Sequence, residues 1–317
     1  MPQGIYTQTV CILLNGSVSL DRVAECLSDY SIRSQHDFKE SWALGGPSLL
    51  LDFQPEVNGT VLVDTVDHPW PDSMGDPDNE PMIFAAWSMG AFGPFTYPGG
   101  LGRAAQQCWS WDEGKTIPQS HTGFLRIRTS YVLGLGDDAK LMPEDYKPAP
   151  ELRFITDIAD KLLNLPEALC YYNPNGEVLC PPQAVRDALQ YADNNELLPL
   201  DLWANVRLFN VGEGWFLMDT VGNSQLWMSD VEACCPSGMD NSEVYGFLRN
   251  TSWYLFLNGE VIKDGDTMDG PGGRWQAHSH NTEQPEPPRK RLCWLPQQGE
   301  PVPQFLVDRI SQNEQST

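Results

Sequence analysis

The densest group of metal-binding side chains in the sequence is a short acidic run that holds Asp264, Asp266 and Asp269. Carboxylates at such spacing are the ligands that Ca²⁺ and Mg²⁺ prefer. An EF-hand loop beginning at Asp264 would need Gly at its sixth position and Glu at its twelfth, where the chain has Asp269 and Trp275. A phosphatase-type motif would need Thr or Val where Met268 stands. We therefore expect a turn or a contact loop here, and a metal-dependent hydrolase remains the alternative.

Two histidines follow the acidic run at strand spacing. His278 and His280, with the nearby carboxylates, have the donor types of a transition-metal site. No cysteine accompanies them at zinc spacing, and the other histidines are scattered singly, so no Ser-His-Asp or Cys-His arrangement follows from order or spacing. The Gly-rich segments lack the Lys-Ser/Thr pair of a phosphate loop. The sequence predicts a protein that is not an enzyme and that holds no metal and no cofactor.

The balance of charge is strongly acidic. The chain has 43 Asp and Glu against 20 Lys and Arg, a formal net charge of −23. Coulomb repulsion makes direct binding to nucleic acid or to an anionic membrane unfavourable. The charge either keeps the protein in solution or steers a basic partner toward it, and the second interpretation predicts exposed acidic loops.

Candidate partner-binding residues lie in three such loops, at 67–80, 136–145 and 264–269. The first is rich in Pro and acidic residues and also carries Trp70, which is expected to be an aromatic anchor at the interface. The complete set of candidates is Asp67, Trp70, Asp72, Asp76, Asp78, Glu80, Asp137, Asp138, Glu144, Asp145, Asp264, Asp266 and Asp269.

The elements that position these loops are mixed helices and strands. Apolar residues make up 41% of the 317 residues, enough for a folded core. The pattern predicts an α+β fold of mainly antiparallel sheets, with helices on one face and two closely packed subdomains. The boundaries are expected at residues 1–148 and 149–295, followed by a polar tail at 296–317, part of which is expected to be disordered. The eight cysteines include no C-x-x-C pair and no export or membrane segment is evident, which favours reduced thiols and a cytoplasmic location.

Local patterns place the individual elements. Residues 125–131 alternate apolar and basic side chains, which predicts a half-buried antiparallel strand. Asn175-Gly176, a pair that readily takes positive φ, predicts a hairpin turn. The other expected elements are a strand at 9–14 before a helix from 20, hairpins at 48–53 with 60–66 and at 202–210 with 214–220, and helices at 101–109, 152–165, 182–192 and 241–257.

Several of these segments resemble a known family. The Gly/aromatic turn at 90–100, the hairpin at 173–176, the strand at 202–207 and the pair Gly265-Asp266 are similar to features of bacterial immunity proteins from polymorphic-toxin and type VI secretion loci, in particular the immunity family numbered fifty-two. The likeness runs from about Thr9 to Trp294. It implies an α+β fold, a cytoplasmic location and one cognate toxin, typically a DNase of restriction-endonuclease-like fold.

The resemblance and the charge lead to one hypothesis. An inhibitor can occupy the positive groove of a DNase by offering carboxylates in place of phosphates. The expected function is therefore that of an immunity protein that neutralises a basic nuclease by electrostatic and steric occlusion. A hydrolase that uses Asp264, Asp266 and Asp269, and an adaptor that loads a secreted effector, are the alternatives.

Overall fold

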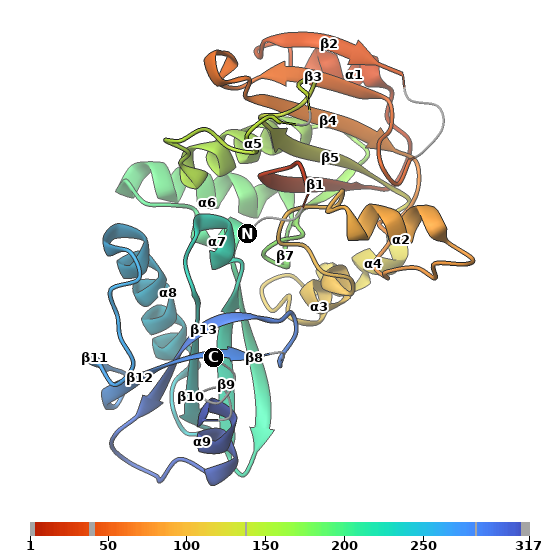
Figure 1. Cartoon of the computed structure of the whole chain (residues 1–317). Coiled ribbons are helices and arrows are strands. Elements are labelled where there is room, and N and C mark those ends of the chain that lie inside the picture. The colour runs from red at the N-terminus through yellow and green to blue at the C-terminus, as the bar shows by residue number, and fades with distance from the viewer. Residues whose placement is uncertain (1–3, 38–41, 137, 283, 312–317) are drawn as a thin grey trace. The chain divides into compact units, whose positions relative to one another are not determined.

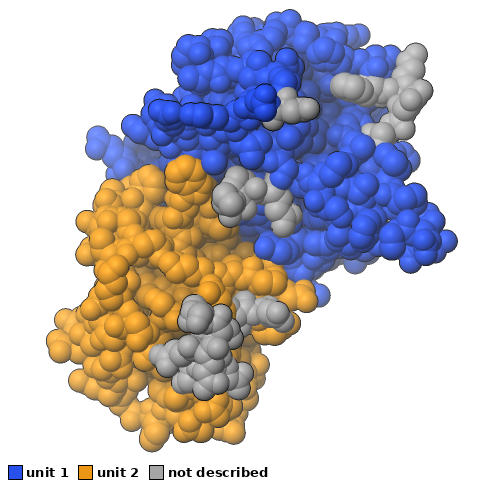
Figure 2. Space-filling model, in the orientation of Figure 1, with its two compact units in different colours: residues 1–203 blue, residues 204–317 orange. Residues whose placement is uncertain are grey.

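The computed structural model describes residues 4–37, 42–136, 138–282 and 284–311. The chain divides into two compact units, residues 1–203 and residues 204–317 (Figure 2). The boundary predicted from the sequence is at 148/149. The boundary lies later because the helix that begins at Pro148 packs against the central strands of unit 1. Among the described helices, none is long and apolar enough to cross a membrane.

Unit 1 is built on a seven-stranded sheet in the order β2-β3-β4-β5-β1-β6-β7 (Figure 1). Every neighbouring pair in it is antiparallel. Its strands are β1 (Gln8–Leu14), β2 (Ile32–His36), β3 (Ser48–Asp52), β4 (Thr60–Val66), β5 (Gly123–Ser130), β6 (Ala168–Asn173) and β7 (Val178–Cys180). Its helices are α1 (Leu20–Cys26), α2 (Pro81–Ser88), α3 (Gly100–Gln106), α4 (Ile117–Ser120), α5 (Pro148–Leu162), α6 (Pro182–Asn195) and α7 (Leu200–Trp203), with 3-10 turns at Pro55–Val57 and Asp112–Thr116.

Helices cover both faces of this sheet. α5 packs against β1 and β5 on one face. On the other face Cys11 and Leu13 join a core cluster with Trp70, Phe92 and Leu101, so α2, α3 and the turn between them lie over that side. The α+β class and the antiparallel sheets are confirmed, but the expectation that helices cover a single face does not hold in unit 1.

Unit 2 is built on a six-stranded sheet in the order β11-β12-β13-β10-β9-β8. All pairs are antiparallel except β10 with β13, which run parallel. Its strands are β8 (Asn205–Gly212), β9 (Trp215–Val221), β10 (Asp230–Pro236), β11 (Thr267–Gly270), β12 (Gly273–Thr282) and β13 (Arg289–Pro296). Its helices are α8 (Asn241–Asn258) and α9 (Gln304–Ser311), with a 3-10 turn at Asn223–Leu226.

The last helix corrects the expectation of an unstructured tail. α9 places Leu306 and Ile310 in a buried cluster with Trp215 and Leu217 of β9. These apolar residues recur four apart, the spacing of one helix face. Asp308 between them is exposed, whereas Arg309 is mostly buried against Glu232. A short amphipathic helix therefore has the overall composition of a polar tail. Residues 312–317 lie outside the described part.

Candidate functional site

Charged side chains occupy one face of the sheet in unit 2. Successive residues of a strand point to opposite faces, so Asp230 and Glu232 of β10 share a face, as do Arg289 and Arg291 of β13. Strand register brings them together, because Asp230 lies beside Arg291 and Glu232 lies beside Asp219 of β9. This face is therefore a polar layer inside the unit, built from four strands that are consecutive in the sheet.

The first half of the layer is a chain of ion pairs on Asp219. Arg207 of β8 donates two hydrogen bonds to its carboxylate, at 2.9 and 2.8 Å, and Arg289 donates a third at 2.6 Å. Nε of Arg289 also lies 2.9 Å from Oδ2 of Asp230. Burial acts to raise the pKa of Asp219, but the charges of Arg207 and Arg289 outweigh it and hold the pKa below its usual value. This part of the layer is a network of buried ion pairs.

The second half is centred on Glu232. Arg309 of α9 donates to both oxygens of its carboxylate, and Arg291 adds a bond to Oε2 at 3.0 Å. Burial acts to raise the pKa of Glu232, but the hydrogen bonds and charges of the arginines lower it well below the usual value. Burial and the neighbouring charge of Arg289 lower the pKa of Arg291 to about 10. Glu232 therefore stays ionised inside the unit.

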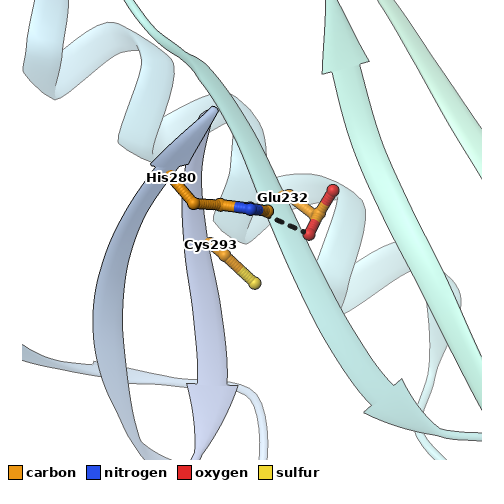
Figure 3. Close-up of side chains that lie close together, drawn as sticks. All are labelled: Glu232, His280 and Cys293. Atoms are coloured by element: carbon orange, nitrogen blue, oxygen red, sulfur yellow. Dashed lines mark ion pairs between the residues drawn. The ribbon is translucent and has the colours of Figure 1, made fainter. Parts of the chain in front are cut away.

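His280 and Cys293 lie beside this carboxylate. Figure 3 shows the His280 ring pointing at Glu232, with the sulfur of Cys293 on the same side of the sheet. Nε2 of His280 lies 3.6 Å from Oε1 of Glu232, and the candidate ligand atoms of all three residues lie within 4.8 Å of one another. Neither ring nitrogen of His280 has a hydrogen-bond partner, although the residue is only 4% exposed. Among the described residues, this is the group of His, Cys and acidic side chains whose donors converge closely enough for a metal ion.

The thiol of Cys293 is strongly shielded. A hydrogen bond with Cys234 and complete burial both raise its pKa well above the usual value. Cys234 lies two residues after Glu232 on β10, so both side chains share the face of the polar layer. A buried thiol with this environment stays protonated unless a cation binds it.

The first acidic loop contains both structural and exposed residues. Trp70, expected as an interface anchor, is 4% exposed and packs edge-on against Phe92, Phe124 and Tyr172, so that expectation is wrong. Asp72 is half-buried, since its oxygens accept hydrogen bonds from the backbone N–H groups of Leu101 and Gly102, both at 2.8 Å. It caps α3 instead of facing a partner.

The remaining carboxylates of that loop are exposed. Asp67, Asp76, Asp78 and Glu80 all lie on the surface, and no Lys, Arg or His of the described chain makes an ion pair with them. Asp76 accepts hydrogen bonds from the backbone of Asp78 and of Asn79, which orders the turn before α2. The loop thus presents four negative charges that make no ion pair with the described residues.

The second and third acidic loops are partly neutralised. Asp138, Glu144 and Asp145 are exposed, and Lys140 pairs with Glu144 at 2.7 Å. Asp137 lies outside the described residues. In the third loop Asp264 accepts from the backbone N–H of Ser279, Asp266 accepts from that of Lys263, and Asp269 lies 3.6 Å from Nε of Arg274.

The three carboxylates of the third loop contact three different groups. Each makes a separate local contact, and all are exposed. The two histidines lie beside different carboxylates. His278 lies 3.7 Å from Asp264, whereas His280 points into the unit toward Glu232. Sequence reasoning missed Glu232 and Cys293. The alternation of charged and apolar residues in 230–233, Asp-Val-Glu-Ala, is the signal that could have indicated a polar buried face.

Unit 1 contains an apolar depression of about 970 Å³ over β2, β3 and β4. Leu44, Leu50, Leu62 and Leu133 are among its lining residues. The polar groups at its rim are engaged by neighbours, since Arg33 pairs with Asp52. The depression offers volume for an apolar group.

Comparison with known proteins gives one match. A family model described as a domain of unknown function, DUF4261, matches residues 219–294. No curated protein and no solved structure matches the chain. The matched segment begins at Asp219 and ends one residue after Cys293, so it includes Glu232, His280 and most of the polar layer.

Proposed function

We propose that the chain is a binding protein that neutralises a basic protein partner, and that this partner is a nuclease toxin, as in the immunity proteins that parts of the sequence resemble. The observation that carries the proposal is the loop between β4 and α2. Its carboxylates Asp67, Asp76, Asp78 and Glu80 are exposed and have no cation of the described chain beside them. Such a surface attracts a cationic partner and leaves the charges available to it.

The distribution of charge supports the same function. The fully buried charged residues nearly balance, so most of the net charge of −23 lies outside the cores of the two units. The buried set consists of Arg126, Arg128, Arg207 and Arg291 against Asp64, Glu151, Glu177, Asp219, Asp230 and Glu232. A DNase must present a positive groove to phosphates, and exposed carboxylates compete for that groove.

Apolar side chains accompany the acids of this loop. Met74 is 37% exposed and Met82, at the start of α2, is 47% exposed. Methionine adapts its shape to a partner surface, and a few desolvated apolar contacts supply most of the tightness of an interface. In the proposed complex the carboxylates speed association, the methionines slow dissociation, and the protein acts in the cytoplasm before the toxin reaches the chromosome.

The test is co-expression with a nuclease encoded by the neighbouring gene. The wild-type chain is expected to restore growth, and binding of the two purified proteins is expected to slow as salt rises. A triple charge reversal, Asp67→Lys with Asp78→Lys and Glu80→Lys, should lower the association rate about 10- to 1000-fold. The matched control reverses Asp138, Glu144 and Asp145 of the second loop.

Two outcomes contradict the proposal at different levels. If the wild-type chain leaves the nuclease fully toxic, the immunity function is wrong. If both triple reversals slow association equally, the first loop is not the binding surface and only overall charge matters. If the chain is required for delivery of the toxin but leaves the toxicity of that toxin unchanged, the chain is an effector-loading adaptor.

A further inference from the structure

We propose that Glu232, His280 and Cys293 bind a divalent transition-metal ion of the zinc class inside unit 2. This inference goes beyond partner binding and does not depend on it. The sequence predicts no metal for this chain, and the acidic run with Asp264, Asp266 and Asp269 is not part of this group. The three residues come from β10, β12 and β13, which the sheet places side by side.

The donor set and its spacing fit such an ion. A carboxylate oxygen, an imidazole nitrogen and a thiolate sulfur are common zinc ligands, and zinc binds them in a tetrahedron. Metal–ligand bonds of about 2.0–2.3 Å place tetrahedral ligands about 3.3–3.8 Å apart. Nε2 of His280 and Oε1 of Glu232 are already 3.6 Å apart, and no pair in the group exceeds 4.8 Å. Small side-chain rotations would close the remaining distance.

The imidazole ring of His280 gives independent support for a bound ion, because its nitrogens lack hydrogen-bond partners. Its side chain is fully buried, yet neither Nδ1 nor Nε2 makes a hydrogen bond. Leaving a buried polar group unpaired costs about 1–3 kcal/mol, so folded proteins rarely do it without a purpose. A metal ion on Nε2, the nitrogen that faces Glu232, would give one of these two buried nitrogens a partner.

The surrounding charges also suit the ion. Arg309 and Arg291 hydrogen-bond the Glu232 carboxylate and hold it in place, which is the role that outer groups play around metal ligands. Oε1 keeps a side toward His280. A water molecule would complete the tetrahedron. Binding would release the thiol proton of Cys293 to solvent, and the charges of one thiolate and one carboxylate would balance the divalent ion.

The test uses the full-length chain and metal content as its readout. Because the ligands are buried, the protein is unfolded with reductant and chelator, then refolded with Zn²⁺ or with Co²⁺ in the absence of oxygen. One Zn²⁺ per chain should remain after gel filtration. The Co²⁺ form should show the visible bands of a tetrahedral site and a sulfur-to-cobalt charge-transfer band.

Variants distinguish this site from adventitious binding. Cys293→Ser and His280→Gln should each weaken Co²⁺ binding at least tenfold, and Cys293→Ser should also diminish the charge-transfer band. Cys235→Ser is the matched control, since Cys235 is an equally buried thiol of β10 that points to the opposite face. If Cys293→Ser does not refold, His280→Gln decides. Refolded wild-type protein without stoichiometric metal, or an equal loss in Cys235→Ser, would overturn the proposal.

Discussion

Arg309 of the last helix donates two hydrogen bonds to the carboxylate of Glu232, a residue 77 positions earlier in the chain. The pair ties α9 to the centre of the sheet in unit 2. Glu232 is fully buried and Arg309 is mostly buried, so water cannot replace the contact when it is broken. A segment with the composition of a polar tail therefore contributes to the core of the unit.

Replacing Arg309 tests this contribution. Arg309→Ala leaves Glu232 with only Arg291 as an ionic partner, and breaking one side of a buried pair costs about 3–5 kcal/mol. The loss should appear as a lower midpoint in urea unfolding followed by circular dichroism. Arg274→Ala is the control in the same unit, because the pair of Arg274 with Asp269 is exposed and should contribute less than about 1 kcal/mol. Equal effects of the two substitutions would show that α9 is not anchored through Glu232.

A second buried ionic group lies in unit 1 and makes its own prediction. Asp64 of β4 pairs with Arg126 at 2.6 Å and with Arg128 at 3.1 Å, and all three side chains are fully buried. Burial acts to raise the pKa of Asp64, but the charges of the arginines lower it. Asp64→Asn keeps the volume and removes the charge, so two buried arginines lose their counter-ion. We expect a loss of about 3–5 kcal/mol in unfolding free energy.

The control for Asp64 is Asp52 on β3, one strand nearer the edge of the same sheet. Asp52 accepts hydrogen bonds from Ser31 and Arg33, and both partners of the ion pair are partly exposed. Asp52→Asn should change stability by less than about 1 kcal/mol. A similar small effect at Asp64 would mean that backbone carbonyls alone satisfy Arg126 and Arg128.

Trp70 gives a prediction that separates a core residue from an interface residue. Its ring packs edge-on against Phe92 at 5.2 Å and Phe124 at 5.3 Å between ring centroids. Trp70→Ala should therefore cost about 3–5 kcal/mol of unfolding free energy through the cavity that it leaves. Trp109→Ala is the control, because Trp109 is 62% exposed, and it should change the urea midpoint very little. If Trp70→Ala left stability unchanged and weakened partner binding alone, Trp70 would be an interface anchor after all.

Much of the fold could be predicted because local sequence determines it. The three expected hairpins, the long helix that ends before Gly259 and the opening strand and helix are all present. The strand expected from Leu202 begins only at Asn205, because Leu202 and Trp203 lie in α7. The turn at 173–176 also forms, but the residue with positive φ is Glu177, at 51°, and not Gly176. The buried carboxylate of Glu177 is paired with Arg103 at 2.7 Å, which fixes the side chain of this residue. That partner lies 74 residues away and leaves no trace in the local pattern.

The candidate site was harder to predict because its contacts are distant in sequence. Arg126 and Arg128 alternate with apolar residues, which indicated a strand with one exposed face, yet the whole of β5 is buried. The carboxylate that permits this, Asp64, lies on another strand. In the same way His280 was grouped with neighbouring acids, whereas its nearest carboxylate is 48 residues earlier, at Glu232. Register between strands, which sequence periodicity does not specify, decides both cases.

The last prediction concerns Glu151 of α5 and the dependence of stability on pH. Its carboxyl group is buried and accepts hydrogen bonds from Thr7 at 2.5 Å and from Tyr131 at 2.6 Å, and Tyr146 lies at 3.3 Å. Burial raises the pKa of Glu151 from 4.5 to about 7, and the hydrogen bonds offset this only in part. No arginine or lysine faces it in the hydrogen-bond network of the described chain, so the fold favours the neutral acid.

The raised pKa of Glu151 determines how the stability of the fold depends on pH. A carboxyl group whose pKa is higher in the folded state than in the unfolded state stabilises the fold below pH 4.5, and this stabilisation is lost as pH rises through about 7. The loss amounts to roughly 3 kcal/mol. Glu151→Gln keeps a neutral group of similar size and should remove this part of the pH dependence, measured as the difference between urea midpoints at pH 5 and pH 8. Glu144→Gln, at an exposed carboxylate, should keep the wild-type dependence. If Glu151→Gln loses as much stability as the wild type between the two pH values, Glu151 is ionised throughout and its hydrogen bonds outweigh its burial.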